Sequence, residues 1–237
     1  MIDAGLRYQG SELALFADAI RWKRYYAQSM RPFLGPDVLE VGAGIGGTTQ
    51  VLCAGTQRRW LCLEPDAVLV ARIDERRRAG ELPACCESRV GTLSAVARTE
   101  RFDTVLYVDV LEHIEDDRGE LAQAALLLNP GGHLIVLAPA HTWLWSPFDV
   151  AVGHHRRYTR ASLLALGPGG TRVVSARYLD AVGLLASLGN RLVLRSELPT
   201  AAQIRAWDRF MIPLSRIVDP LLGYAAGKTV VAVWQRA

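Results

Sequence analysis

The sequence of 237 residues contains few lysines, no long apolar run and no repeat, and each shortage excludes a class of protein. Lys23 and Lys228 are the only lysines, and the formal net charge is +3, so we expect no nucleic-acid-binding surface. No apolar stretch reaches the roughly 18 residues that span a bilayer, so we expect no stable membrane insertion, and we expect no signal peptide. These absences favour a single cytoplasmic domain over residues 1–237.

Cysteine is also scarce. The four cysteines have no C-x-x-C spacing, and two of them lie in apolar runs typical of strands. Because disulfides are rare in the cytosol, we expect reduced and buried thiols. They are Cys53, Cys62, Cys85 and Cys86.

Apolar residues make up half of the sequence, which suffices to bury one large core, and short apolar runs alternate with helical patterns. The runs are continuously apolar, as in parallel sheets that helices cover on both faces. We therefore predict a doubly wound α/β fold with its ligand at the carboxyl ends of the strands. Strands are predicted at 38–41, 60–64, 87–90, 102–109, 133–138, 171–179 and 229–234, and helices at 11–30 (capped by Ser11), 46–55, 66–79 and 117–128.

A glycine-rich turn follows the first predicted strand. Gly42, Gly44 and Gly46 let the backbone approach a ligand and adopt angles that a Cβ forbids. The N–H groups of the next helix then face a polar ligand. Glu64 ends the second strand, where one carboxylate can accept both hydroxyls of a ribose. The pattern predicts a nucleotide-containing cofactor.

A nicotinamide cofactor is one alternative, since Gly42-x-Gly44-x-x-Gly47 satisfies the dinucleotide fingerprint. One feature counts against an NAD(P)-dependent oxidoreductase. Glu40 lies inside the strand, where dehydrogenases usually carry an apolar residue. The Tyr-x-x-x-Lys spacing of such enzymes occurs once, at Tyr224 and Lys228 near the end of the sequence.

Four sequence blocks, in order and at the usual separations, resemble class I S-adenosylmethionine-dependent methyltransferases. They are VLEVGAGIGGTT (38–49), EPD (64–66), FDTVLYVDVLEHI (102–114) and LLNPGGHLIVLAP (127–139). The flanking runs WKRYY (22–26), FDVAVGHHRRYT (148–159), WDR (207–209) and GKT (227–229) are similar to the type 11/12 bacterial small-molecule subgroup. The resemblance implies a Rossmann-like, seven-stranded sheet with an antiparallel last strand, an N-terminal helix and a helical insertion before that strand.

The resemblance also implies the cofactor, S-adenosylmethionine, with S-adenosylhomocysteine as product. The glycine turn would hold the methionine part, Glu64 the ribose, and Asp109 would lie near the sulfonium. Glu40 would order the turn or meet the cofactor's amino group through water. Many relatives have an acid for adenine where this chain has Gly91-Thr92-Leu93, so backbone groups or Thr92 take that role. The full set is Glu40, Gly42, Ala43, Gly44, Gly46, Glu64, Pro65, Thr92, Leu93, Asp109, Val110 and His113.

The acceptor is expected to be a small molecule, methylated at oxygen or nitrogen rather than carbon. A general base is needed for a hydroxyl or an ammonium, and the candidates are His113, His154 and His155. An arginine of the HHRRY run would suit a carboxylate or phosphate. The alternative reading makes these side chains surface or core residues. The candidate substrate residues are Tyr25, Tyr26, Trp143, Phe148, Arg156, Arg157 and Tyr158.

A divalent metal is a further alternative. Asp109-x-x-Glu112-His113 resembles a run that holds an ion in some O-methyltransferases, with His154 or His155 as a fourth ligand. The run also occurs in metal-free relatives, so we predict no metal. A protein that binds the cofactor without transferring methyl is another alternative.

Within one domain we expect an N-terminal helical cap, a cofactor-binding core, a substrate loop and a helical insertion. Their predicted ranges are 1–36, 37–139, 140–160 and 181–221. The insertion would pack as a cap, and we expect a monomer or a homodimer.

Overall fold

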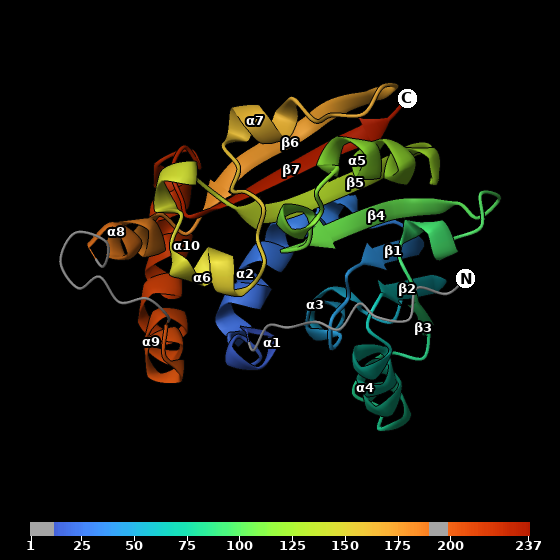
Figure 1. The fold of residues 1–237 in the computed structure, drawn as a ribbon, viewed down its shortest axis with the longest axis horizontal. Coiled ribbons are helices and arrows are strands. Elements are labelled where there is room, and N and C mark those ends of the chain that lie inside the picture. Colours follow the sequence, from blue (N-terminus) through green and yellow to red (C-terminus); the bar gives the residue numbers. More distant parts are fainter. Residues whose placement is uncertain (1–11, 190–198) are drawn as a thin grey trace.

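The computed structural model describes residues 12–189 and 199–237, and it contains a seven-stranded sheet with helices on both faces (Figure 1). The strand order is β3-β2-β1-β4-β5-β7-β6, and β7 runs antiparallel to both of its neighbours. The predicted Rossmann-like fold with an antiparallel last strand is confirmed. The strands are β1 (Asp37–Val41), β2 (Arg59–Glu64), β3 (Cys86–Val90), β4 (Phe102–Val108), β5 (Leu128–Pro139), β6 (Thr171–Leu179) and β7 (Thr229–Arg236).

Side chains of the central strands alternate between two cores. In β1, Val38 points into the first core and Leu39 into the second, and in β4, Leu106 and Val105 divide in the same way. All four side chains are fully buried. Because both faces are covered, the central strands are continuously apolar, as the sequence pattern indicates.

Helices follow the strands, and α4 (Ala67–Arg78), α5 (Asp117–Leu126) and α7 (Arg160–Leu164) begin at side-chain caps. Asp66 accepts a hydrogen bond from the N–H of Val68, and Asp116 accepts one from Gly119. The predicted helix 117–128 is two residues too long, because Leu128 already begins β5. The chain also forms α3 (Gly47–Leu52) and the short 3₁₀ turns η1 (Arg31–Phe33), η2 (Leu93–Ala95) and η3 (Leu111–His113).

The N-terminal region is two helices, so the prediction of one helix over 11–30 is wrong. They are α1 (Glu12–Leu15) and α2 (Ile20–Met30), and the predicted cap Ser11 lies outside the described residues. The start of α2 is held from far along the chain, because the Asp208 carboxylate accepts from the N–H groups of Arg21 and Trp22. A local pattern does not reveal such a cap.

The described part of the 181–221 insertion is helical. It comprises α8 (Ala181–Gly189), α9 (Ala201–Ala206), the π-helical turn η6 (Trp207–Met211) and α10 (Ile212–Leu221). Asp219 of α10 accepts a hydrogen bond from the Tyr25 hydroxyl of α2, and the rings of Trp22 and Trp207 pack together. The insertion and α2 therefore form one helical layer.

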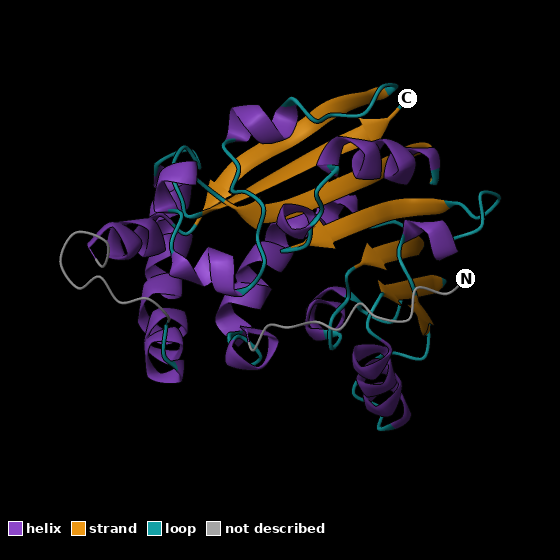
Figure 2. Cartoon of the chain, in the orientation of Figure 1, coloured by secondary structure: helices purple, strands orange, loops and turns teal. Residues whose placement is uncertain are grey.

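The segment after β5 crosses the carboxyl ends of the central strands. It contains η4 (Thr142–Leu144) and α6 (Pro147–Ala151), and α6 lies with α10 beyond those strand ends, whereas α2 runs on behind the sheet (Figure 2). Across residues 12–189 and 199–237, no helix has the length and apolar character to cross a membrane.

Candidate active site

A cleft of about 1370 Å³ opens at the carboxyl ends of β1, β2 and β4. Pockets for one drug-sized ligand measure roughly 300–1,000 Å³, so this cleft has room for two molecules side by side. The glycine turn, the tips of the strands, α2, η6 and the segment after β5 all contribute to its lining.

The glycine turn and Glu64 form one hydrogen-bonded unit at this cleft. The N–H groups of Gly42 and Ala43 donate to the carbonyl of Leu63, 2.8 and 3.2 Å away. The Glu64 carboxylate accepts from the N–H of Gly44 at 2.9 Å and from that of Asp66 at 3.0 Å. Burial raises the pKa of Glu64, and the two N–H donors oppose the rise. The turn therefore positions the carboxylate, and the carboxylate positions the turn.

The glycines of the turn are needed for backbone conformation and for space. Gly42 has a φ of +68°, and a Cβ there would lie 2.5 Å from a methyl carbon of Val110. Gly46 has a φ of +75° and caps α3 in the left-handed region. Gly42 and Gly44 line the cleft, whereas Ala43 and Gly46 lie behind it.

Glu40 lies behind the turn and does not line the cleft. Its side chain is 2% exposed and accepts hydrogen bonds from the hydroxyl of Thr49 at 2.6 Å and the indole N–H of Trp60 at 2.7 Å. Burial raises its pKa to about 7, against the effect of the two donors. Since Thr49 belongs to α3, Glu40 ties this helix to β1 and β2, which fits the first of its two predicted roles.

Asp109 directly follows β4 with a left-handed backbone, φ 54°, and its side chain is accessible from the cleft. Desolvation by the surrounding protein raises its pKa to about 6, while His154, Lys228 and Arg157 oppose the rise. Thr92, Pro65 and Val110 also line the cleft. Leu93 is buried outside it.

His154 is held by Asp149 at the rim of the acceptor side. Its Nδ1 lies 2.8 Å from Asp149 Oδ1, and Arg157 donates to both oxygens of the same carboxylate at 2.7 and 3.0 Å. Asp149 is fully buried. Burial opposes its ionisation, but the donors outweigh this and lower its pKa to about 2. Asp149 is therefore an anion at neutral pH.

Glu112 lies close to His113 and His154, and its carboxyl group is fully buried. Among the described residues neither of its oxygens has a hydrogen-bond partner, and its Oε1 is 3.9 Å from His154 Nε2. Burial, together with the negative charge of Asp109, raises its pKa well above the ordinary value. Burial lowers the pKa of His113 to about 4, so this ring, 4.7 Å from that of His154, is neutral at pH 7.

Glu112, His113 and His154 offer one ligand atom each within 4.8 Å of one another. Two imidazoles and a carboxylate are a donor set that suits a divalent transition metal. The predicted ligands Asp109 and His155 are not part of this group. The metal alternative thus keeps three of its five candidate residues.

The structure divides the predicted acceptor residues into two sets. Tyr26, Phe148 and Arg157 line the cleft together with His113 and His154. Tyr26 donates to, or accepts from, the hydroxyl of Thr48, another cleft residue, at 2.8 Å.

The other set lies outside the cleft. Tyr25 binds Asp219, as described above, and Trp143 is 45% exposed and stacks on His141. Arg156 and Tyr158 both contact the carboxylate of Asp117, at 2.8 and 2.9 Å, and the N–H of His155 donates to the carbonyl of Glu112. These five residues are Tyr25, Trp143, His155, Arg156 and Tyr158.

Both lysines of the sequence line the cleft, which the sequence analysis did not foresee. Lys228 Nζ is 3.4 Å from an Asp180 oxygen and 3.8 Å from the centre of the Trp207 ring. Asp149 was also missed, although it lies in the FDVAVGHHRRYT run. The rarity of lysine could have singled out Lys23 and Lys228, and the position of Asp149 five residues before His154 could have indicated a partner for that histidine.

A sequence model described as "Methyltransferase domain" matches residues 39–134. A demethylmenaquinone methyltransferase of Tropheryma whipplei is 28% identical over 144 residues, covering 56% of this chain and 55% of that protein. A ubiquinone biosynthesis O-methyltransferase of Azorhizobium caulinodans is 33% identical over 112 residues, covering 46% and 43%. The chain spans about half the length of the curated relatives it matches.

Solved methyltransferases share the fold over nearly the whole chain. The N-methyltransferase NodS of Bradyrhizobium japonicum, solved in complex with S-adenosyl-L-homocysteine, is 14% identical with a TM-score of 0.60. The similarity covers 98% of this chain and 93% of that one. Residues 39–134 therefore match a methyltransferase domain in sequence, and the chain shares the fold of solved methyltransferases over nearly its whole length.

Proposed function

We propose that this protein transfers the methyl group of S-adenosylmethionine to an oxygen or nitrogen atom of a small molecule. The observation that carries the proposal is the bond between Glu64 and the N–H of Gly44 at the edge of the cleft. It places a carboxylate beside a glycine turn inside a sequence that matches a methyltransferase domain.

The residues present fit this cofactor. The carboxylate of Glu64 would accept the ribose hydroxyls, and the turn would lie against the methionine part, because Gly42 and Gly44 line the cleft. Thr92 would meet the adenine, and Asp109 would lie toward the sulfonium. When bound, the cofactor supplies an electrophilic methyl group and leaves as a neutral thioether.

The acceptor half of the cleft is apolar and rich in aromatic side chains. Such walls exclude water and orient a flat or apolar molecule, and positioning of this kind contributes roughly 7–11 kcal/mol to lowering a barrier. The aromatic side chains of this half are Phe16, Trp22, Tyr26, Trp145, Phe148 and Trp207.

His154 would act as the general base. Since Asp149 is ionised and can only accept, the hydrogen of the neutral ring must be on Nδ1, which leaves the Nε2 lone pair free. The 3.9 Å from Nε2 to Glu112 is too long for a hydrogen bond, so this lone pair stays available for a hydroxyl or ammonium proton. An O-methyltransferase among the relatives supports a hydroxyl acceptor.

The proposal is tested by incubating the protein with methyl-labelled cofactor and a panel of phenols, alcohols and amines. We expect label to enter a phenol or amine and the product to gain one CH₂ in mass. Cofactor binding without transfer to any member of the panel or to a metabolite extract would favour the alternative that methyl transfer is not its role. Action in the cytoplasm, as a monomer or homodimer, stays a prediction.

A further inference from the structure

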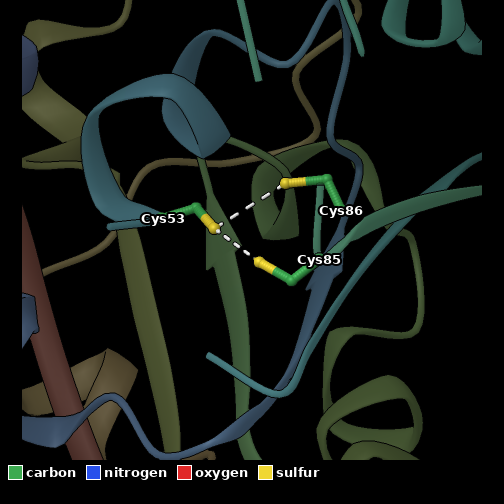
Figure 3. A group of neighbouring side chains, drawn as sticks. All are labelled: Cys53, Cys85 and Cys86. Atoms are coloured by element: carbon green, nitrogen blue, oxygen red, sulfur yellow. Dashed lines mark hydrogen bonds between the residues drawn. The ribbon is translucent and has the colours of Figure 1, made fainter. Parts of the chain in front are cut away.

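Three of the four cysteines, all outside the cleft, point toward one another. Cys53 ends α3, while Cys85 and Cys86 stand at the start of β3, and Figure 3 shows their sulfur atoms converging between these elements. The Sγ atom of Cys53 is 3.5 Å from that of Cys85 and 3.7 Å from that of Cys86, and all three lie within 4.8 Å of one another. All three are free thiols, and Cys85 is only partly buried, whereas the sequence predicts every cysteine to be buried.

From this convergence, we infer that Cys53, Cys85 and Cys86 form a binding site for a soft, thiophilic metal ion, Zn²⁺ or Cu⁺, separate from the methyl-transfer cleft. Thiolates are the protein ligands that such ions prefer. Two sulfur ligands of a tetrahedral zinc ion, each at about 2.3 Å, are about 3.8 Å apart. The observed separations of 3.5 and 3.7 Å come within a few tenths of an ångström of this spacing.

A fourth donor is also at hand. The side-chain oxygen of Gln57 lies 3.6 Å from the sulfur of Cys53. An oxygen at about 2.1 Å and a sulfur at about 2.3 Å from one tetrahedral zinc are about 3.6 Å apart. Zn²⁺ would thus complete its shell with Gln57, whereas Cu⁺ is satisfied by three thiolates.

The backbone holds the three cysteines in place. The N–H of Cys53 donates to Thr49, the carbonyl of Cys85 accepts from the N–H of Trp60, and the N–H of Cys86 donates to Pro83. Cys53 and Cys86 are buried, but Cys85 is partly exposed and provides a path for entry. The site therefore needs little rearrangement to bind an ion.

A bound ion would join α3 to β3 at the amino-terminal side of the sheet. None of the three cysteines lines the cleft, which the other ends of the same elements reach through Gly47 and Gly91. The six residues of α3 separate the two sites by about 9 Å along the helix. Metal binding is therefore testable without methyl transfer.

The test is titration of the reduced, metal-free, full-length protein with Zn²⁺ against a chromophoric chelator, and with Co²⁺ to detect sulfur-to-metal charge-transfer absorption. We expect one ion per chain with a sub-micromolar Kd. Cys53→Ser and Cys85→Ser should each weaken binding by more than the roughly 10–100-fold that loss of an outer partner costs. The matched control is Cys62→Ala, since Cys62 is buried against Thr49 outside the cluster.

Two further arms make the result decisive. Gln57→Ala should weaken Zn²⁺ binding but leave Cu⁺ binding unchanged, which identifies the fourth ligand. Circular dichroism must show that the serine variants are folded, and Cys85→Ser at the most exposed cysteine is the safer of the two. The inference is overturned if the protein binds neither Zn²⁺ nor Cu⁺ with a Kd below one micromolar. It is also overturned if the Cys53→Ser and Cys62→Ala variants bind the ion with equal affinity. If two titratable thiols are lost in air and no metal binds, the cluster forms a disulfide and is not a metal site.

Discussion

Nδ1 of His154 lies 2.8 Å from a carboxylate oxygen of Asp149, and this contact determines which ring nitrogen faces the cleft. Arg157 binds both oxygens of the same carboxylate and so holds the pair at one angle. The HHRRY run, whose members are indistinguishable as substrate residues in sequence, thus divides into residues that face the cleft and residues that face Asp117.

His154→Gln should lower kcat by about 10²–10⁴-fold, because this is what a general base contributes. Affinity for S-adenosylhomocysteine should stay near wild type, since the ring lies on the acceptor side. Steady-state kinetics and calorimetry on one preparation measure both quantities. The matched substitution is His155→Gln, whose ring does not line the cleft. A large loss with His155→Gln and none with His154→Gln would contradict the assignment.

Gly42→Ala should destabilise the fold and weaken cofactor binding. A left-handed φ costs a residue with a Cβ about 1–2 kcal/mol, and the overlap with Val110 adds about 1–3 kcal/mol. Gly80→Ala isolates the first cost, because Gly80 has a φ of +75° and no atom within 4 Å of the added Cβ. Urea denaturation of both variants gives the comparison, and equal losses would show that Val110 has room to move.

Glu40 should make stability depend on pH. Its pKa is about 7 when folded, above the ordinary 4.5, so the folded state binds the proton more tightly. The associated stability is present below pH 4.5 and is lost as the pH rises through about 7. The rise in the pKa of Glu40 from 4.5 to about 7 corresponds to about 3 kcal/mol in the free energy of unfolding.

The control for this prediction is Glu40→Gln, which keeps an acceptor for Thr49 and Trp60 but does not titrate. Urea denaturation of both proteins between pH 4.5 and 8 should show the wild type losing stability relative to the variant. Parallel pH profiles would mean that Glu40 is not the titrating group.

The sheet and the glycine turn were predictable because their signals are local. Continuous apolar runs indicate buried parallel strands, and glycines at alternate positions mark a turn with left-handed backbone. Glu64 was recognisable because it ends a strand about 20 residues after the turn, where sheet topology brings both to one edge.

Contacts between distant segments were not predictable. Asp208 caps α2 from 186 residues away, and a single long helix was expected because nothing near residue 18 signals the break. A basic run likewise does not reveal which guanidinium faces inward, since that depends on where Asp117 and Asp149 lie after folding. The convergence of the cysteines was unpredictable for the same reason, because 31 residues separate Cys53 from Cys85.

The central claim is that the cleft beside Glu64 binds S-adenosylmethionine, and calorimetric titration with S-adenosylhomocysteine tests it most directly. We expect one site per chain in the wild type and affinity about 10–100-fold weaker in Glu64→Gln, since hydrogen bonds to a charged group contribute about 1.5–3 kcal/mol. Glu87→Gln, on the half-exposed edge strand, serves as the control and should bind like the wild type. Binding of NAD(H) but not of S-adenosylhomocysteine, or wild-type affinity in Glu64→Gln, would contradict the account.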